Sequence, residues 1–307
     1  MLSPGDIESI IVSLQNRFSF GEAEITIEMN PEDFTTDKVR GYVSSGVNRI
    51  VLGIQSLNKA LRRTIGRRGN TEVRKILDMF FLQQGLNRCI DLITGIPGQT
   101  YESCLEDLII ISGYRPEHIS LYLLSVESGT PLSERLITDD LFDDMQLTVW
   151  GRSIDFLVNE GYNHYEISNF SLPGFESIHN SKYWHFIPYA GFGAGAHSFT
   201  GSTRYSNNML LNDYIRQKHA VYTFDNRNES DIVVEFFMTA LRDLRGFTAV
   251  EFRAVTGFEL TSELFRKIES LLHRGLISEN NGKYFLTRMG LFSANSVIYE
   301  LTEDYIR

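Results

Sequence analysis

A junction that occurs three times in the first 170 residues constrains this chain more than any other feature. In each junction a helix-like segment ends at a glycine and a strand-like run follows within a few residues; the glycines are Gly46, Gly85 and Gly161. Glycine just after a helix supplies the left-handed residue of a C-cap, and the apolar residue behind it can fold back onto the last turn. The sequence therefore predicts helices that lead directly into strands.

Strands and helices alternate through this part of the chain. The strand-like runs are residues 24–28, 50–54, 90–93, 119–123 and 165–167, and the helical patterns are residues 35–45, 71–84, 100–113 and 139–160. Thr100 and Asp139 are the expected N-caps of the last two helices. Such alternation favours right-handed crossovers and a parallel sheet. We expect an α/β domain over residues 1–205.

The start of the chain is unusual for such a domain. Ser3 followed by Pro4 is typical of an N-cap and a first helical residue, so a helix precedes the first strand. One side of the strand at residues 24–28 then lacks a partner unless another segment covers it, and an exposed apolar edge favours aggregation. We expect an N-terminally truncated domain; the alternative is an ordinary start with this strand in the middle of the sheet.

Beyond about residue 205 the alternation stops, and we expect a mainly helical domain over residues 206–307. The expected helices are residues 208–220, 229–244, 249–256, 261–274 and 288–301, with a hairpin turning at Asn281 and Gly282 before the last of them. Helices followed by a small hairpin are typical of a winged-helix-like module. No helix is rich in Lys or Arg and the net charge is -10, so nucleic acid is not the expected partner.

Polar residues close several of the apolar strands. They are Glu28, Gln55, Asp91, Ser125 with Glu127, and Asn169. Because functional groups collect at the carboxyl ends of parallel strands, we expect a binding rim there. Each of them taken singly could instead be a structural polar group whose hydrogen bonds are satisfied.

Several motifs then follow one another in a specific order. They are Glu28-Met29-Asn30-Pro31, residues 45–56, Ile65-Gly66-Arg67, residues 90–100, 117–122 and 127–131, and later residues 164–170, 179–184 and 191–199. Their order and spacing resemble the radical-SAM domain of oxygen-independent coproporphyrinogen III oxidases and of HemW-type haem chaperones. The last three motifs look more like the chaperone branch. The resemblance implies a partial (β/α) barrel that lacks its first βα units, followed by a helical C-terminal domain.

The resemblance also assigns ligands to S-adenosylmethionine. Glu28, Gln55, Arg67 and Asp91 match positions that contact it in the family. Carboxylates can accept hydrogen bonds from ribose hydroxyls or an amino group, and a guanidinium can pair with the methionine carboxylate. Arg68 is a neighbouring candidate for that pairing, and without the family match Arg67 would be taken for a solvated charge.

The chain departs from the family at the iron–sulfur cluster. The family's Cys-x3-Cys-x2-Cys loop and Gly-Gly-Gly-Thr-Pro stretch are both absent, and the two cysteines, Cys89 and Cys104, are too few and wrongly spaced. They lie in a predicted strand and a predicted helix, where buried inert thiols are expected. The family implies a [4Fe–4S] cluster whose ligands this chain lacks, so radical catalysis by this chain alone is not expected.

Haem binding depends on other residues. Haem is a flat apolar ring whose iron takes an axial ligand such as His. In the chaperone branch the His-Asn-x-x-Tyr-Trp segment is associated with haem, so the resemblance makes His179 the first candidate ligand. The alternative is that His179 and Asn180 cap a turn and that the aromatic residues around them belong to the core.

The leading hypothesis is a HemW-like haem-binding chaperone that passes haem to acceptor proteins. One alternative is an oxygen-independent coproporphyrinogen III oxidase seen as a fragment; another is a scaffold or nucleic-acid-binding protein that uses the winged-helix-like end. No apolar run is long enough to span a bilayer, no secretory signal is recognisable, and two cysteines suit a reducing compartment. A cytoplasmic protein that binds haem or a porphyrin is therefore expected; the sequence leaves its oligomeric state open.

Overall fold

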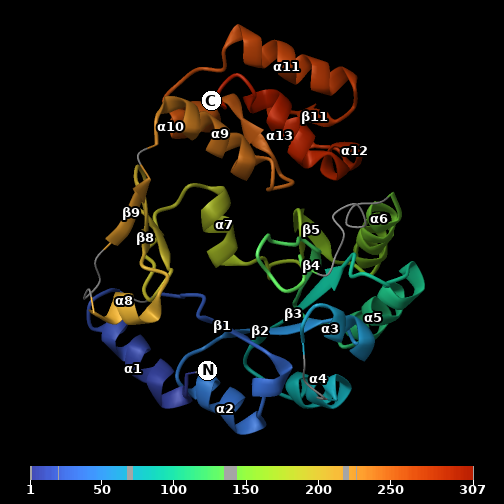
Figure 1. The fold of residues 1–307 in the computed structure, drawn as a ribbon, viewed down its shortest axis with the longest axis vertical. Coiled ribbons are helices and arrows are strands. Elements are labelled where there is room, and N and C mark those ends of the chain that lie inside the picture. The colour runs from blue at the N-terminus through green and yellow to red at the C-terminus, as the bar shows by residue number, and fades with distance from the viewer. Residues whose placement is uncertain are drawn as a thin grey trace. The chain divides into compact units, whose positions relative to one another are not determined.

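The computed structural model describes residues 2–19, 21–67, 72–134, 144–216, 221–225 and 227–306. The chain forms two compact units, an N-terminal unit of Met1–Glu176 and a C-terminal unit of Ser177–Arg307 (Figure 1). The sequence predicts two independently folding domains with a boundary near residue 205. The division into compact units does not test independent folding, so this boundary stays a prediction.

The N-terminal unit is built on a six-stranded sheet with the order β1-β2-β3-β4-β6-β5. The strands are β1 (Thr26–Met29), β2 (Arg49–Gln55), β3 (Asn87–Thr94), β4 (His118–Leu123), β5 (Asn163–Glu166) and β6 (Asn169–Ser171). The first four are parallel, which confirms the predicted α/β sheet. β6 runs antiparallel to both β4 and β5, a hairpin that the alternation did not predict. Among the described residues the sheet is open and does not close into a barrel.

The predicted helices of this unit are present, and the structure adds α3 and a short 3-10 turn that the sequence did not predict. The helices are α1 (Pro4–Gln15), α2 (Thr36–Ser44), α3 (Lys59–Thr64), α4 (Val73–Phe81), α5 (Tyr101–Gly113) and α6 (Asp144–Asn159), with a 3-10 turn, η1, at Pro31–Asp33. Gly46, Gly85 and Gly161 have positive φ angles of 102°, 74° and 89°, as the three junctions require. Thr100 caps α5, whereas the expected cap Asp139 lies outside the described residues.

The beginning of the chain packs on the helix that follows β1. Ser3 caps α1 in a capping box with Asp6, and the Tyr42 hydroxyl of α2 donates to the Leu2 carbonyl at 2.6 Å. β1 pairs with β2 and forms one edge of the described sheet. The alternative that placed this strand in mid-sheet is therefore wrong for the described chain.

The two faces of the sheet differ in character. Alternate residues of the central strands are apolar and at most 2% exposed; they are Ile50, Leu52, Ile90, Leu92, Ile119 and Leu121. Helix side chains that are fully buried, Tyr42, Leu77, Phe80 and Leu108, complete this core. Because successive side chains of a strand point to opposite faces, the intervening residues form a second face, and several of these are polar.

The C-terminal unit begins with α7 (Ile178–Trp184) and a three-stranded antiparallel sheet. Its strands are β7 (His197–Phe199), β8 (Arg204–Asn207) and β9 (Val221–Asp225), with α8 (Leu211–Arg216) between the last two. The sequence did not predict this sheet. The expected helix at residues 208–220 corresponds in part to α8, and its end lies outside the described residues.

The rest of the C-terminal unit has the helices and hairpin expected of a winged-helix-like module. The elements are α9 (Glu229–Ala240), β10 (Phe247–Thr248), α10 (Ala249–Thr256), α11 (Ser262–His273), β11 (Ile277–Asn280), β12 (Lys283–Leu286), α12 (Arg288–Phe292) and α13 (Ala294–Thr302). Asn281 and Gly282 both have positive φ, which confirms the predicted turn. The expected last helix is divided at Ser293. None of the described helices is long and apolar enough to cross a membrane.

Candidate functional site

A row of aligned residues crosses the second face of the large sheet. Gly53 of β2 is in register with Asp91 of β3, Asp91 with Ser120 of β4, and Ser120 with Asn169 of β6. Residues in register on neighbouring strands present their side chains to the same face. The row therefore places a carboxylate, a hydroxyl and an amide side by side.

Asp91 is the residue of this row with the most unusual environment. Its Oδ1 atom is buried and accepts no hydrogen bond from the described residues. Burial raises the pKa of Asp91 to about 6, with a further contribution from the Glu28 carboxylate. The Ser120 hydroxyl and the cations Arg49 and Arg67 lower the pKa in turn. A buried carboxylate oxygen without a donor can accept a hydrogen bond from a ligand.

Gln55 and Gly53 shape the surface beside Asp91. Gln55 ends β2 in the left-handed region, with φ of 67°, and it is only 8% exposed. A Cβ atom added at Gly53 would lie 2.9 Å from Gln55 Nε2 and 3.9 Å from Arg67 Nη2. The absence of a side chain at Gly53 therefore leaves room for the amide and guanidinium groups above it.

The Arg67 side chain approaches Gly53 from the segment that follows α3. Its Nη1 atom donates to Oδ1 of Asn30, the residue after β1. Gln55, Arg67 and Asp91 thus gather around Gly53, while Glu28 lies on the neighbouring strand and is exposed. Arg68, the alternative to Arg67, lies outside the described residues.

The expected rim at the strand ends needs correction. Asp91 lies within β3 rather than at its end, and Asn169 begins β6, which runs against β4. The reason is that the chain reverses after β5, so Asn169 joins the polar face instead of a carboxyl edge. The polar groups belong to one face of the sheet as much as to its rim.

A cavity of about 620 Å³ opens beside Arg67. It is lined by residues 63–67 and by Ser125, Val126, Glu127, Thr130, Pro131 and Leu132. These segments follow β2 and β4, so Ser125 and Glu127 lie at a carboxyl end of the sheet as predicted. Small-molecule sites commonly measure roughly 300–1,000 Å³. The cavity volume lies within this range.

A buried polar cluster fixes the chain where it leaves β2. Ser56 Oγ donates to Asp107 Oδ2 of α5 at 2.6 Å, and Arg62 Nη1 donates to the carbonyls of Ser56 and Leu57 at 2.8 and 2.9 Å. All three side chains are buried, and burial raises the pKa of Asp107. Sequence reasoning missed this cluster because its partners are 51 residues apart.

The two cysteines do not fit a cluster site. Cys89 of β3 and Cys104 of α5 are both buried, and burial raises the pKa of each thiol. Thiolates, not thiols, bind iron. Across the described residues no group of three or more His, Cys, Asp or Glu side chains could hold a metal ion.

His179 lies in the other unit, on α7. Ser177 caps this helix through a bond from the Asn180 backbone N–H, so the alternative that His179 and Asn180 cap a turn is wrong. The imidazole is exposed, and its Nε2 atom shares a hydrogen bond of 2.8 Å with the Tyr183 hydroxyl. Of the nearby aromatic residues, Phe199 is 2% exposed but Phe192 is 78% exposed, so only part of this segment belongs to the core.

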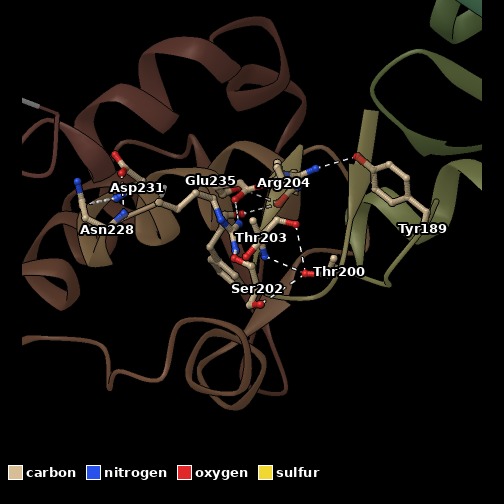
Figure 2. A network of polar contacts seen from close by, with 11 residues as sticks. Tyr189, Thr200, Ser202, Thr203, Arg204, Asn228, Asp231 and Glu235 are labelled. Carbon is tan, nitrogen blue, oxygen red and sulfur yellow. Dashed lines mark hydrogen bonds and ion pairs between the residues drawn. The ribbon is translucent and has the colours of Figure 1, made fainter. Parts of the chain in front are cut away.

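A charged network supports the same segment from α9. Glu235 receives bonds from Arg204 of β8 and from Arg227, and Arg204 Nη1 donates to the Tyr189 hydroxyl at 2.8 Å (Figure 2). The guanidinium carbons of both arginines lie 4.6 and 5.2 Å from the centre of the Phe199 ring. No sequence motif marks these residues, because the network joins segments that are far apart along the chain.

Comparison with known proteins agrees with this architecture. The family described as the radical SAM superfamily matches residues 2–109. The haem chaperone HemW of Lactococcus lactis is 31% identical over 318 residues, which span all of this chain and 83% of that protein. HemW of Haemophilus influenzae is 31% identical over 99% of this chain and 81% of its own length.

A solved structure shows the same fold. Coproporphyrinogen III oxidase (HemN) of Escherichia coli, a radical SAM enzyme, superposes with a TM-score of 0.79 and 20% identity, over 98% of this chain and 75% of that one. At that identity the likeness concerns the fold alone. Together with the relatives of the full chain, it leads to one conclusion: this protein belongs to the HemW family of the radical-SAM superfamily.

Proposed function

We propose that this chain is a haem chaperone, which binds haem through the segment around His179 and passes it to acceptor proteins. The observation that carries the proposal is the similarity of the whole chain to proteins named haem chaperones. The HemN likeness gives no separate support for an oxidase, because it concerns the fold.

The C-terminal unit offers what haem requires. Haem needs an axial ligand and an apolar surface for its ring. His179 presents an exposed imidazole, and Ile178, Ile187 and Phe192 are large apolar residues of the same segment with 45 to 78% of their surface exposed. Exposed apolar residues that gather in one segment favour a binding surface over a folding core.

The polar face of the N-terminal unit fits S-adenosylmethionine. Among the described residues the buried Oδ1 atom of Asp91 accepts no hydrogen bond, and Gly53, without a side chain, lets the Gln55 amide and the Arg67 guanidinium lie close to the sheet beside it. In this proposal Asp91 and Glu28 accept hydrogen bonds from the ligand's hydroxyl or amino groups, and Arg67 pairs with its carboxylate. S-adenosylmethionine supplies a sulfonium group when it is bound, and these residues hold and orient it.

The residues of this chain do not fit an iron–sulfur cluster. Two buried thiols with raised pKa values cannot supply the three thiolates that the family uses. No catalytic step that requires electrons from a cluster is proposed for this chain.

Equilibrium dialysis with labelled S-adenosylmethionine tests the site proposed on the polar face of the N-terminal unit. Asp91→Asn keeps the shape of the side chain but turns one acceptor into a donor, so we expect affinity to fall about tenfold or more. Asp37→Asn, at an exposed position of α2, should bind like the unchanged protein. Equal affinities for the two variants, or no binding by the unchanged protein, would contradict this assignment.

Haem transfer tests the chaperone role. The haem-loaded chain is mixed with apo-cytochrome b562 as a probe acceptor, and the acceptor's absorption spectrum is followed in time. Direct transfer predicts a rate that rises with acceptor concentration. A rate that stays constant would mean that haem first dissociates into solution, which is not delivery.

A further inference from the structure

The candidate haem ligand has a partner of its own. We propose that the Tyr183 hydroxyl caps the Nε2 atom of His179, and that a chain of contacts ending at Glu235 keeps this cap in place. The inference rests on the proposed haem function and refines the site that it uses.

The cap is built into one helix. His179 and Tyr183 are four residues apart on α7, a spacing that brings side chains to the same helix face. The hydroxyl lies 2.8 Å from Nε2, and the two ring centres are 5.1 Å apart at 85°. The proposed cap has the hydroxyl as donor and Nε2 as acceptor, which is the arrangement of the neutral tautomer that carries its proton on Nδ1. Iron binds through the same lone pair. The cap and the iron therefore compete for one atom.

Tyr183 is not well suited to bind iron itself. Iron prefers the phenolate form of tyrosine, but burial raises the pKa of Tyr183 and the neighbouring Tyr189 raises it further. The side chain thus remains a protonated donor at neutral pH. This favours a cap on His179 over a second ligand.

The Tyr183 ring packs against Tyr189. It meets the Tyr189 ring edge to face, with centres 4.8 Å apart at 77°. Tyr189 is anchored by two backbone hydrogen bonds with Phe199, of 2.8 and 2.9 Å, and by the bond that Arg204 donates to its hydroxyl.

Arg204 is in turn fixed by the carboxylate of Glu235. Its guanidinium donates a hydrogen bond to Glu235 of α9 (Figure 2). Arg227 donates to the other oxygen of the same carboxylate. The side chains of Glu235 and Arg227 are 17% and 6% exposed. A continuous series of contacts thus connects Tyr183 to Glu235, and in this proposal it returns the hydroxyl to Nε2 after a displacement.

Such a cap suits a carrier that must release its cargo. Haem binds to His179 only after the hydroxyl has left Nε2, and the hydroxyl can return as the iron leaves. A hydrogen bond of this kind should weaken haem binding by about threefold to tenfold relative to an uncapped imidazole. Tyr183 is therefore a positioning residue that lowers affinity at the site it belongs to.

The cap can be tested without haem. Diethyl pyrocarbonate reacts with an unprotonated imidazole nitrogen, and the rate at His179 is measured by mass spectrometry of its peptide. Tyr183→Phe keeps the ring and its contact with Tyr189 but removes the hydroxyl, so His179 should react several-fold faster. Tyr299→Phe, at an exposed position of α13, should leave the rate unchanged. An unchanged rate in Tyr183→Phe would overturn the cap whatever the protein does with haem.

Haem titration of the same variants completes the test. Tyr183→Phe should bind haem about threefold to tenfold more tightly, with the same Soret band as the unchanged protein. Weaker binding would mean that the hydroxyl contacts haem or iron, which contradicts the cap. If the unchanged protein binds no haem while Tyr183→Phe speeds the reaction at His179, the proposed function fails and the cap stands.

A matched pair of variants tests whether Glu235 supports the cap. Glu235→Gln should also speed the reaction at His179, because the neutral amide holds Arg204 less firmly. Glu229→Gln changes an exposed residue of the same helix and should not. Equal rates in both variants would restrict the cap to Tyr183 and overturn the role given to Glu235.

Discussion

Asp91 lies in β3 between the buried residues Ile90 and Leu92, at a position where ionising a carboxylate is unfavourable. Its own strand would be more stable with a neutral residue there, because burial raises the pKa to about 6. A residue that opposes stability in this way, with an oxygen that lacks a donor among the described residues, is typical of a binding site.

The raised pKa makes a prediction about stability. An acid whose pKa is about 6 in the folded protein and 3.8 in the unfolded chain destabilises the fold as pH rises through this range. Asp91→Asn removes the titration. The variant should differ least from the unchanged protein near pH 3, below both pKa values, and should gain stability relative to it as pH rises, by on the order of 3 kcal/mol above pH 6. Urea unfolding at a series of pH values measures this; a difference that does not depend on pH would contradict the assigned pKa.

At the scale of the element, the residues at the end of β2 link a buried polar cluster to the candidate binding site. Gln55 adopts a left-handed conformation that costs a non-glycine residue on the order of 1 kcal/mol or more, and the Ser56, Asp107 and Arg62 cluster directly follows it. The cluster therefore holds the turn that places Gln55 over Gly53.

Removing the α5 member of this cluster should affect both stability and binding. Asp107→Ala leaves the buried Ser56 hydroxyl without its acceptor, and we expect a loss of about 1–3 kcal/mol in the free energy of unfolding. S-adenosylmethionine affinity should fall as well, since Gln55 is no longer held. Glu106→Ala, exposed on the same helix, is the control for both measurements. Loss of stability with full affinity would show that the cluster does not position Gln55.

Local sequence signals predicted some elements well and others not at all. Glycine caps and N-caps have short-range causes, so the helix ends at Gly46, Gly85 and Gly161 could be read directly. The strands β7 to β9 could not, because each is short and its pairing depends on residues far along the chain. The same limit applies to the reversal that makes β6 antiparallel to β4.

The candidate site was predicted in part. Glu28, Gln55, Arg67 and Asp91 came from motifs, but only the register of β2 and β3 places Asp91 beside Gly53. The partner of His179 lay within its own motif, at Tyr183, yet the support from Tyr189, Arg204 and Glu235 depends on tertiary contacts. The sequence thus identified the types of residue in the site, but it did not determine how the strands pair or which side chains contact one another.

At the scale of the whole molecule, the residues proposed for the two ligands belong to different units. Those for S-adenosylmethionine lie in the N-terminal unit, and His179 lies in the C-terminal unit. Each unit has its own buried core; that of the C-terminal unit includes Phe236, Phe237 and Phe252.

The two binding functions should therefore separate by mutation. Asp91→Asn should lose affinity for S-adenosylmethionine and keep its haem affinity, whereas His179→Ala should do the reverse. Dialysis and haem titration on both variants measure all four values. Loss of both ligands in either variant, without unfolding in circular dichroism, would contradict the separation.

The central claim is that the chain takes haem at His179, and a haem titration followed by its Soret absorption tests it most directly. The account predicts saturable binding with a shifted Soret band that weakens or disappears in His179→Ala. His273→Ala, which removes an exposed histidine of α11, should titrate like the unchanged protein. Binding that does not saturate, or that is the same in His179→Ala, would contradict the claim.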